Sequence, residues 1–328
     1  MSPMTQTVPR CRPRPHLHHW HPRPLTAAAL PSPSSPPVAE SGDGADAEDV
    51  VAAAELRWHE ARVDGESVSY AAAGSGRTVV FLHGWGLTHR TYVRALEHLA
   101  DRGVRVLAPA LPGLGGTPEL PMEQRSLPGY AHWLGRFLDA VGVAGPVTLV
   151  GHSFGGGVAA QAAHDLPGRV EGLTLVNSVG GAAWSDGPAG VRPIADRPLW
   201  YWGAAATGDA LSVRPSAAGL AAVAVDALRN VVRSPGAFWR TAHLARTADL
   251  TSELDELAAR GLPVTLLWGR GDTVIPRASF ESLRARLHHA VVVTVPGHHG
   301  WLIDDPARFG DAMAGVLATT GVTAAETA

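Results

Sequence analysis

Short apolar runs and amphipathic stretches alternate along the chain from about residue 56 onward. RTVVFLHG at 77–84 is continuously apolar, which is typical of a strand buried on both faces of a sheet. LRWHEARV and ESVSYAAA flank Asp64-Gly65, a pair that indicates a hairpin turn. Further strands are expected at 105–111, 146–153, 170–178, 262–269 and 290–296, and helices at 89–101, 128–141, 155–165, 277–287 and 306–318. This order predicts an α/β fold, a mostly parallel eight-stranded sheet with helices on both faces.

The alternation is interrupted by residues 181–247, which contain several Trp residues and one stretch, 216–232, with a helical pattern. An insertion at the carboxyl end of a strand lies where open α/β sheets bind ligands. We therefore expect a mostly helical cap, the alternative being an excursion unrelated to substrate. The core is expected at 53–180 and 248–320, followed by a C-terminal tail at 321–328.

The first 52 residues are rich in Pro and His and then acidic, without a period that could bury a face, which predicts a disordered tail. His16, His18, His19 and His21 could bind a metal, but this composition favours a tail. LTAAAL is too short for a signal peptide, and the chain lacks a run of about 18 apolar residues that would span a membrane. We expect a cytoplasmic protein with no membrane partner.

Composition excludes several kinds of chemistry. The net charge of -3 over 328 residues gives no indication of a nucleic-acid partner. All 27 basic residues are Arg, which excludes a Schiff-base lysine, a lysine base and a P-loop lysine. Cys11 is the single cysteine, so neither an intramolecular disulfide nor a cysteine metal cluster can form.

Ser153 lies at the centre of Gly151-His152-Ser153-Phe154-Gly155, between the apolar run VTLV and a stretch of small residues that is expected to be helical. A turn this sharp from strand to helix requires residues without bulk two positions before and two after the serine, hence Gly151 and Gly155. It holds the hydroxyl clear of the sheet, near the electropositive start of a helix. The pattern predicts a nucleophile, and an ordinary glycine-rich turn is the alternative.

His83-Gly84-Trp85-Gly86 ends another strand, and its glycines free the backbone to turn across the top of the sheet. The backbone N–H groups of Trp85 and Phe154 are the candidate oxyanion hole. His83 itself is interpreted as a residue that orders this loop rather than as a base.

Asp272 follows the strand ending in WGRGD, and VPGHHGWLIDDP follows the last strand. A carboxylate at this edge can orient an imidazole and stabilise its protonated form. His298 and His299 are adjacent, and successive side chains point in different directions, so only one can face Ser153. The order is serine, aspartate, histidine, which is one of the three known orders for this constellation.

Together GHSFGG, HGWG, WGRGD and GHHGWLIDDP resemble the α/β-hydrolase superfamily, over roughly residues 56 to 320. VLAPALPGLGGTP at 106–118 is similar to the D-x-P-G-x-G loop of that family, with Ala110 at the position of the usual Asp. Many members place the catalytic histidine seven residues before the proline that opens the last helix, and His299 stands seven before Pro306. A His–small–Trp pattern also favours His299, whereas a glycine directly before the histidine favours His298.

The resemblance implies a hydrolase in which Ser153, His299 and Asp272 transfer an acyl group to water, with no cofactor and no metal. The substrate is expected to be a small, largely apolar ester, and the oligomeric state stays open. Two alternatives use the same triad: carbon–carbon bond hydrolysis and cofactor-free haloperoxidase or perhydrolase chemistry. A third is a ligand-binding protein on a hydrolase scaffold.

Overall fold

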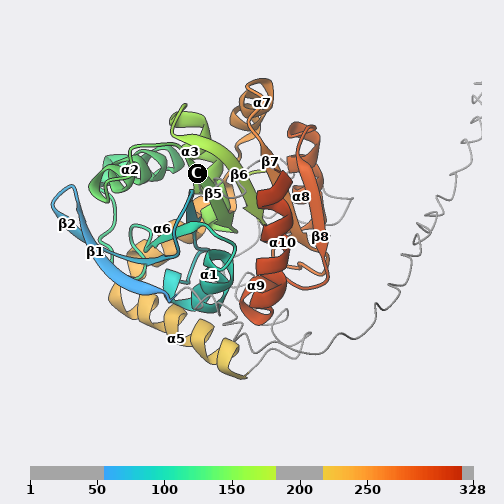
Figure 1. Cartoon of the computed structure of the whole chain (residues 1–328). Helices are drawn as coiled ribbons and strands as arrows, with labels where there is room; N and C mark the ends of the chain where they lie inside the picture. Colours follow the sequence, from blue (N-terminus) through green and yellow to red (C-terminus); the bar gives the residue numbers. More distant parts are fainter. Residues whose placement is uncertain (1–54, 182–216, 320–328) are drawn as a thin grey trace, which may run out of the picture. The chain divides into compact units, whose positions relative to one another are not determined.

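A computed structural model describes residues 55–181 and 217–319 (Figure 1). The predicted N-terminal tail, the predicted C-terminal tail and residues 182–216 of the predicted cap lie outside the described residues. The described strands form one sheet in the order β1-β2-β4-β3-β5-β6-β7-β8. Their bounds are β1 Arg57–Val63, β2 Glu66–Ala73, β3 Thr78–Leu82, β4 Arg105–Pro109, β5 Val147–His152, β6 Val170–Val176, β7 Val264–Gly269 and β8 Val291–Val295.

Strands β1 and β2 are antiparallel and joined by Asp64 and Gly65, both with positive φ, as a tight hairpin requires. β2 also pairs antiparallel with β4, and all other pairs in the sheet are parallel. The predicted hairpin and the predicted mostly parallel sheet of eight strands are therefore confirmed. Because the parallel strands share one direction, the loops that follow β3, β5, β6, β7 and β8 meet at one edge of the sheet.

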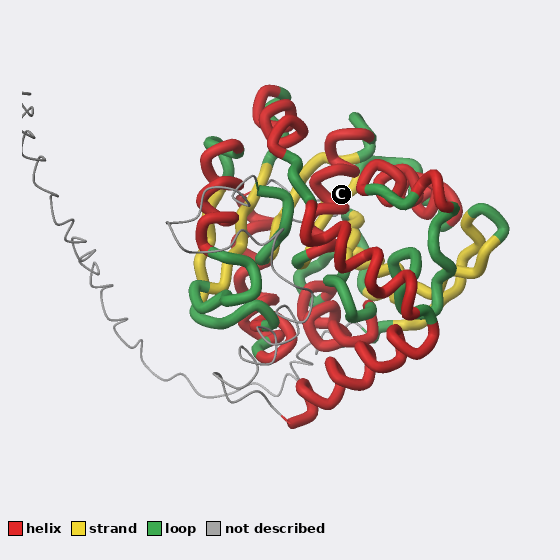
Figure 2. Tube along the Cα trace, turned by 180° about the vertical axis from the view of Figure 1, so that it is seen from behind, coloured by secondary structure: helices red, strands yellow, loops and turns green. Residues whose placement is uncertain are grey.

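Helices lie on both faces of the sheet, which is seen from behind in Figure 2. One face is covered by α2, α3, α7 and α8, and the other by α1, α9 and α10. The helices are η1 His89–Tyr92, α1 Val93–Ala100, η2 Met122–Gln124, α2 Leu127–Ala140, α3 Phe154–Asp165, α5 Ala217–Arg233, α6 Pro235–Thr247, α7 Thr251–Ala259, α8 Arg277–Arg286, α9 Trp301–Asp304 and α10 Pro306–Thr319.

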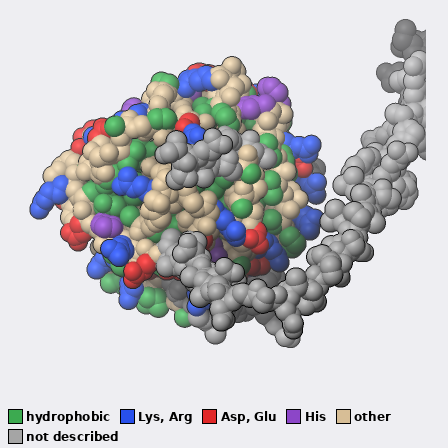
Figure 3. All heavy atoms as spheres, in the orientation of Figure 1, with side chains coloured by type: hydrophobic (Ala, Val, Ile, Leu, Met, Phe, Trp, Pro, Cys, Tyr) green, Lys and Arg blue, Asp and Glu red, His purple; other side chains and the backbone are tan. Residues whose placement is uncertain are grey.

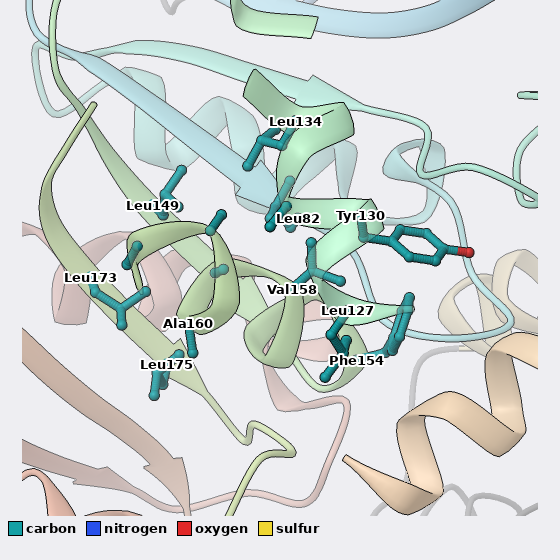
Figure 4. Packing of buried hydrophobic residues seen from close by; sticks show 14 of the residues in the cluster. Leu82, Leu127, Tyr130, Leu134, Leu149, Phe154, Val158, Ala160, Leu173 and Leu175 are labelled. Atoms are coloured by element: carbon teal, nitrogen blue, oxygen red, sulfur yellow. The ribbon is translucent and has the colours of Figure 1, made fainter. Parts of the chain in front are cut away.

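Helix α3 packs tightly on the sheet because its side chains are small. Val158 and Ala160 of this helix are buried in one cluster with Leu149 of β5 and Leu173 of β6 (Figure 4). Fully burying a side chain such as Leu149 stabilises the fold by roughly 1.5–3 kcal/mol. The same packing fixes the start of α3, where Ser153 lies.

The structure differs from the predicted elements in several places, among them helices α6 and α7 and the end of strand β6. α6 lies within the predicted helical insertion, whereas α7 was not expected from the pattern at all. Strand β6 ends at Val176 rather than at 178, because Asn177 takes a left-handed conformation with φ of 44°. Asn177 therefore lies in the loop that follows β6, at the edge of the sheet where Ser153 lies.

Arg and acidic side chains are interspersed over the face shown in Figure 3. Several form ion pairs across elements, such as Arg77 with Glu171 at 2.6 Å and Arg136 with Asp64 at 2.8 Å. Among the helices of the described ranges, we find none with the length and apolar character needed to cross a bilayer.

Candidate active site

Ser153 joins β5 to α3 with φ of 54° and ψ of −117°, a conformation that a residue with a Cβ adopts only under constraint. Backbone hydrogen bonds hold it there. Its N–H donates to Val176 O at 3.0 Å, and its carbonyl oxygen accepts from Gly156 N at 3.0 Å. Because neighbouring β6 supplies the acceptor, the sheet itself stabilises the strained turn.

The glycines around Ser153 leave no space for a side chain. A Cβ on Gly155 would lie 2.2 Å from Leu82 O, and one on Gly151 would lie 2.4 Å from Gly155 O. Sequence reasoning had named both positions. A third, Gly156, was not named, although a Cβ there would lie 2.1 Å from Ser178 Oγ. Substituting any of the three would displace backbone or a buried side chain and with it the turn.

Asp272 and His299 are brought together from the loops that follow β7 and β8. His299 Nδ1 lies 2.9 Å from Asp272 Oδ2, and the aspartate side chain is only 1% exposed. Its other oxygen, Oδ1, accepts the backbone N–H groups of Val274 and Ile275, each at 2.9 Å. The carboxylate is thus held rigidly and offers one oxygen to the imidazole.

Burial alone would raise the pKa of Asp272. The attraction of His299 and the hydrogen bonds that the carboxylate accepts outweigh burial, so the pKa of Asp272 lies below its usual value. The carboxylate therefore stays ionised at neutral pH. An ionised acceptor fixes the hydrogen of His299 on Nδ1, which makes Nε2 the basic nitrogen of the ring.

Asn177 is a site residue that sequence reasoning missed. This buried side chain donates from Nδ2 to Asp272 Oδ2 at 2.6 Å. Its Oδ1 accepts from Gly269 N at 3.1 Å and from Trp301 Nε1 at 3.0 Å. The signal that could have found it is a polar residue directly after a buried apolar strand, at the same edge as Ser153.

His298 is turned away from Asp272. Its Nε2 lies 2.7 Å from Asp304 Oδ2, and its Nδ1 accepts the backbone N–H of Gly300 at 3.2 Å. The structure thus places the two adjacent histidines against different carboxylates, His299 on Asp272 and His298 on Asp304. The contacts of His298 are therefore local, with residues up to six positions away in the sequence.

The loop that contains Trp85 passes beside the serine. A Cβ on Gly84 would lie 3.3 Å from the Cβ of Ser153, a contact so tight that the neighbours would have to shift by a few tenths of an ångström to admit it. Phe154 is the first residue of α3, where backbone N–H groups have no acceptor within the helix. Both backbone groups named for the oxyanion hole therefore lie on segments adjoining Ser153.

His83 orders this loop. Its Nδ1 lies 3.0 Å from Gly84 O and its Nε2 accepts the N–H of Leu111 at 3.0 Å. Burial lowers the pKa of His83 to about 4, so the ring is neutral at pH 7 and each nitrogen has one fixed role. This matches its interpretation as a structural histidine.

Polar side chains on the buried face of helix α5 form hydrogen bonds with the segment that follows Trp85. Asp226 accepts hydrogen bonds from the hydroxyls of Thr88 and Thr91. One turn later, Asn230 donates to Gly86 O at 3.0 Å and accepts from Gly115 N at 2.9 Å. Sequence reasoning named neither residue.

Helix α6 adds an aromatic contact. The indole of Trp85 donates to Phe238 O at 2.8 Å, and the two rings are 4.7 Å apart. Trp239 lies 6.5 Å from the same indole, measured between ring centroids. An apolar aromatic group thus covers the loop next to Ser153.

The described ranges contain no group of three or more His, Cys, Asp or Glu side chains arranged to hold a metal ion. The four N-terminal histidines considered as metal ligands lie outside the described residues.

Comparison with known proteins assigns the chain to a family. The model of the alpha/beta hydrolase family matches residues 79–312. A protein of Mycobacterium phage D29, whose name places it provisionally among the non-heme haloperoxidases, is 29% identical over 259 residues, covering 76% of this chain and 91% of its own. The pimeloyl-[acyl-carrier protein] methyl ester esterase of Aeromonas hydrophila is 28% identical over 253 residues, covering 74% and 96%.

Solved structures show the same fold. A bacterial membrane phospholipase A superposes with a TM-score of 0.67 at 24% identity, over 81% of this chain and 87% of that one. At this identity the likeness concerns the fold alone.

Proposed function

This chain belongs to the alpha/beta hydrolase family, and we propose that it is a serine hydrolase that cleaves a carboxylic ester or related acyl bond through an acyl-enzyme. The observation that carries the proposal is the 2.9 Å contact between His299 Nδ1 and the buried Asp272 carboxylate, at the sheet edge where Ser153 occupies a strained turn. The substrate in this proposal is small and largely apolar.

His299 carries out the proton transfers of the proposed reaction. His299 Nε2 takes the proton of the Ser153 hydroxyl as the oxygen attacks the carbonyl carbon, and it then protonates the leaving group. Asp272 stabilises the imidazolium without taking up the proton. In the second half, His299 deprotonates a water molecule, which attacks the acyl-enzyme; the bond to Ser153 Oγ then breaks, the imidazolium returns the proton to that oxygen, and the acid is released.

The tetrahedral intermediates carry a negative oxygen. We assign its stabilisation to the backbone N–H groups of Trp85 and Phe154, the latter at the positive end of the α3 dipole. Fixed donors of this kind act without reorganisation during the reaction. Removing one such donor in serine hydrolases costs about 10²–10³ in rate.

The proposed apolar substrate rests on the aromatic surroundings of the loop. Trp85, Phe238 and Trp239 pack against one another, and aromatic rings supply large contact areas at low entropic cost. The Aeromonas relative is an esterase by name, which supports an ester as the bond cleaved.

The test compares Ser153→Ala with wild type on a series of p-nitrophenyl esters of increasing acyl length, together with labelling by a fluorophosphonate probe. We expect wild type to label stoichiometrically and hydrolyse the short esters, and Ser153→Ala to do neither while unfolding at the same temperature. Ser67→Ala is the matched control, because this exposed strand residue hydrogen-bonds only Glu60 among the described contacts. Equal activity in Ser153→Ala and wild type rules the proposal out.

A second candidate, cofactor-free haloperoxidase or perhydrolase chemistry, is favoured by the name of the phage relative. In that reaction hydrogen peroxide replaces water as the nucleophile that attacks the acyl-enzyme. Measuring peracid formation from acetate and peroxide beside ester hydrolysis separates the two. A peracid rate above the ester rate would favour the second candidate.

A further inference from the structure

Two buried side chains, those of Tyr92 and His152, have no role in the proposed mechanism. They connect the loop that contains Trp85 to the backbone of His299. His152 precedes Ser153 and is 1% exposed. Its Nδ1 lies 2.8 Å from the hydroxyl of Tyr92, and its Nε2 lies 3.0 Å from the carbonyl oxygen of His299. The Tyr92 hydroxyl also accepts the backbone N–H of Gly84 at 3.3 Å.

The ends of this chain of hydrogen bonds fix its direction. A backbone carbonyl only accepts, so His152 must present Nε2–H to His299 O. Burial, together with repulsion from His299, lowers the pKa of His152 to about 3, so the ring carries a single N–H hydrogen at neutral pH. Its Nδ1 therefore accepts from the Tyr92 hydroxyl, whose own pKa is raised by burial. The Tyr92 oxygen is then left to accept from Gly84 N–H.

The space around this chain is closed. A Cβ on Gly84 would lie 3.1 Å from His152 Nδ1 and 3.3 Å from the Tyr92 hydroxyl. The Tyr92 ring packs 4.9 Å from Phe81, between ring centroids, and the His152 ring lies 4.8 Å from that of His299. Because the rings have little room to move, a displacement at one end is transmitted to the other.

From this geometry we propose that Tyr92 and His152 are positioning residues. They fix the position of the loop that contains Trp85 relative to His299, the proposed base. Gly84 directly precedes Trp85, whose N–H is assigned to the oxyanion hole, and the chain ends on the backbone of His299. The inference rests on the proposed function. It adds that one hydrogen-bonded unit fixes the positions of both the Trp85 N–H and His299, which would otherwise be positioned independently.

Tyr92→Phe is the central test, because it removes only the hydroxyl and retains the ring that packs on Phe81. We expect kcat on the best p-nitrophenyl ester to fall by about 10-fold or more, with KM changed less than about 2-fold. The affinity for phenylboronic acid, which forms a tetrahedral adduct with the serine, should fall by the same factor as kcat/KM.

Tyr130→Phe is the matched control. Tyr130 is also buried, and its hydroxyl donates to a backbone carbonyl, Pro112 O at 2.9 Å, outside this chain of hydrogen bonds. A purely structural role predicts that both Phe variants lose similar thermal stability and that neither changes the ratio of boronate to substrate affinity. That result, or full activity in Tyr92→Phe, would overturn the proposal.

His152 is tested with two variants. His152→Gln retains an amide N–H that can reach His299 O, whereas His152→Met has a similar length without a donor. We expect the Gln variant to keep more kcat than the Met variant, and equal rates would contradict the proposed role of the Nε2–H donor.

Failure of the proposed function is recognised separately. If wild type does not react with the fluorophosphonate, there is no serine hydrolase for these residues to position, and both proposals fall. If wild type reacts, ¹⁵N NMR of the histidine side chains should show His152 as the neutral Nε2–H tautomer down to about pH 5, given its lowered pKa. A protonated ring or the Nδ1–H tautomer at that pH would overturn the inference alone.

Discussion

Histidines at the site edge fall into two groups with opposite surroundings. His298 and His299, the carboxylate-paired histidines, lie 2.7 and 2.9 Å from Asp304 and Asp272. The other group, called here the buried histidine cluster, is bonded to backbone groups and hydroxyls, and its members are His83, His89 and His152.

The difference shows how one residue type is given two roles. Burial lowers the pKa of His83 to about 4 and that of His89 and His152 to about 3, so these rings stay neutral and act as fixed donors and acceptors. A ring against a carboxylate can instead accept a proton without leaving its place. In the proposed mechanism His299 transfers protons, whereas the buried histidines only hold their hydrogen-bond partners in place.

The largest effect should separate the two carboxylate-paired histidines. His299→Ala removes the proposed base, and we expect kcat to fall by about 10³-fold or more, as loss of a triad member does. His298→Ala removes a local contact, and its loss should stay below about 10-fold. Steady-state kinetics on the same ester measures both. The reverse order would leave the fold unchanged and assign the base to His298.

The buried histidine cluster should make the fold sensitive to acid. Because its folded-state pKa values lie below the ordinary 6.5, the unfolded chain binds more protons between pH 6.5 and about 4. Stability is therefore complete above pH 6.5 and declines as pH falls through this window, by up to about 1.4 kcal/mol per pH unit for each histidine. Urea unfolding at a series of pH values measures the slope.

His89→Gln provides the control for this slope, because it removes one titrating ring whose nearest polar contact is Ser69 Oγ at 3.4 Å. The slope should decrease by about 1.4 kcal/mol per pH unit. An unchanged slope would show that folding does not lower the pKa of His89.

A smaller effect should come from Asn177, which supports the carboxylate side without contacting the reacting atoms. Asn177→Ala leaves Asp272 with its other hydrogen bonds, so we expect kcat/KM to fall by about 10- to 100-fold rather than by the factor for His299→Ala. Ser178→Ala is the neighbouring control, since that buried hydroxyl donates only to Val179 O at 2.7 Å among the described contacts. Similar losses in both variants would argue for a general packing defect.

The residues that could be predicted from the sequence are those whose conformation depends on their immediate neighbours. Ser153 lies between glycines at a strand-to-helix boundary, and Asp64-Gly65 lies between two alternating runs, so their backbone conformations follow from their neighbours. His152 and Asp226 could not be found in this way, and the local signal for Asn177, a polar residue directly after a buried strand, does not identify its partner. Each acts through a partner far along the chain, such as Asp272 for Asn177 and Thr88 for Asp226.

The sequence by itself determined the order of the eight strands and of most helices, the sharp turn at Ser153 and the short list of acids and histidines at one sheet edge. These depend on hydrophobic periodicity and on turn chemistry, which act over a few residues. Only the tertiary structure decided that His299 rather than His298 meets Asp272, and that His152 is buried and neutral. Distances between distant strands and the loss of solvent around each ring settle those points, and neither is written in the local pattern.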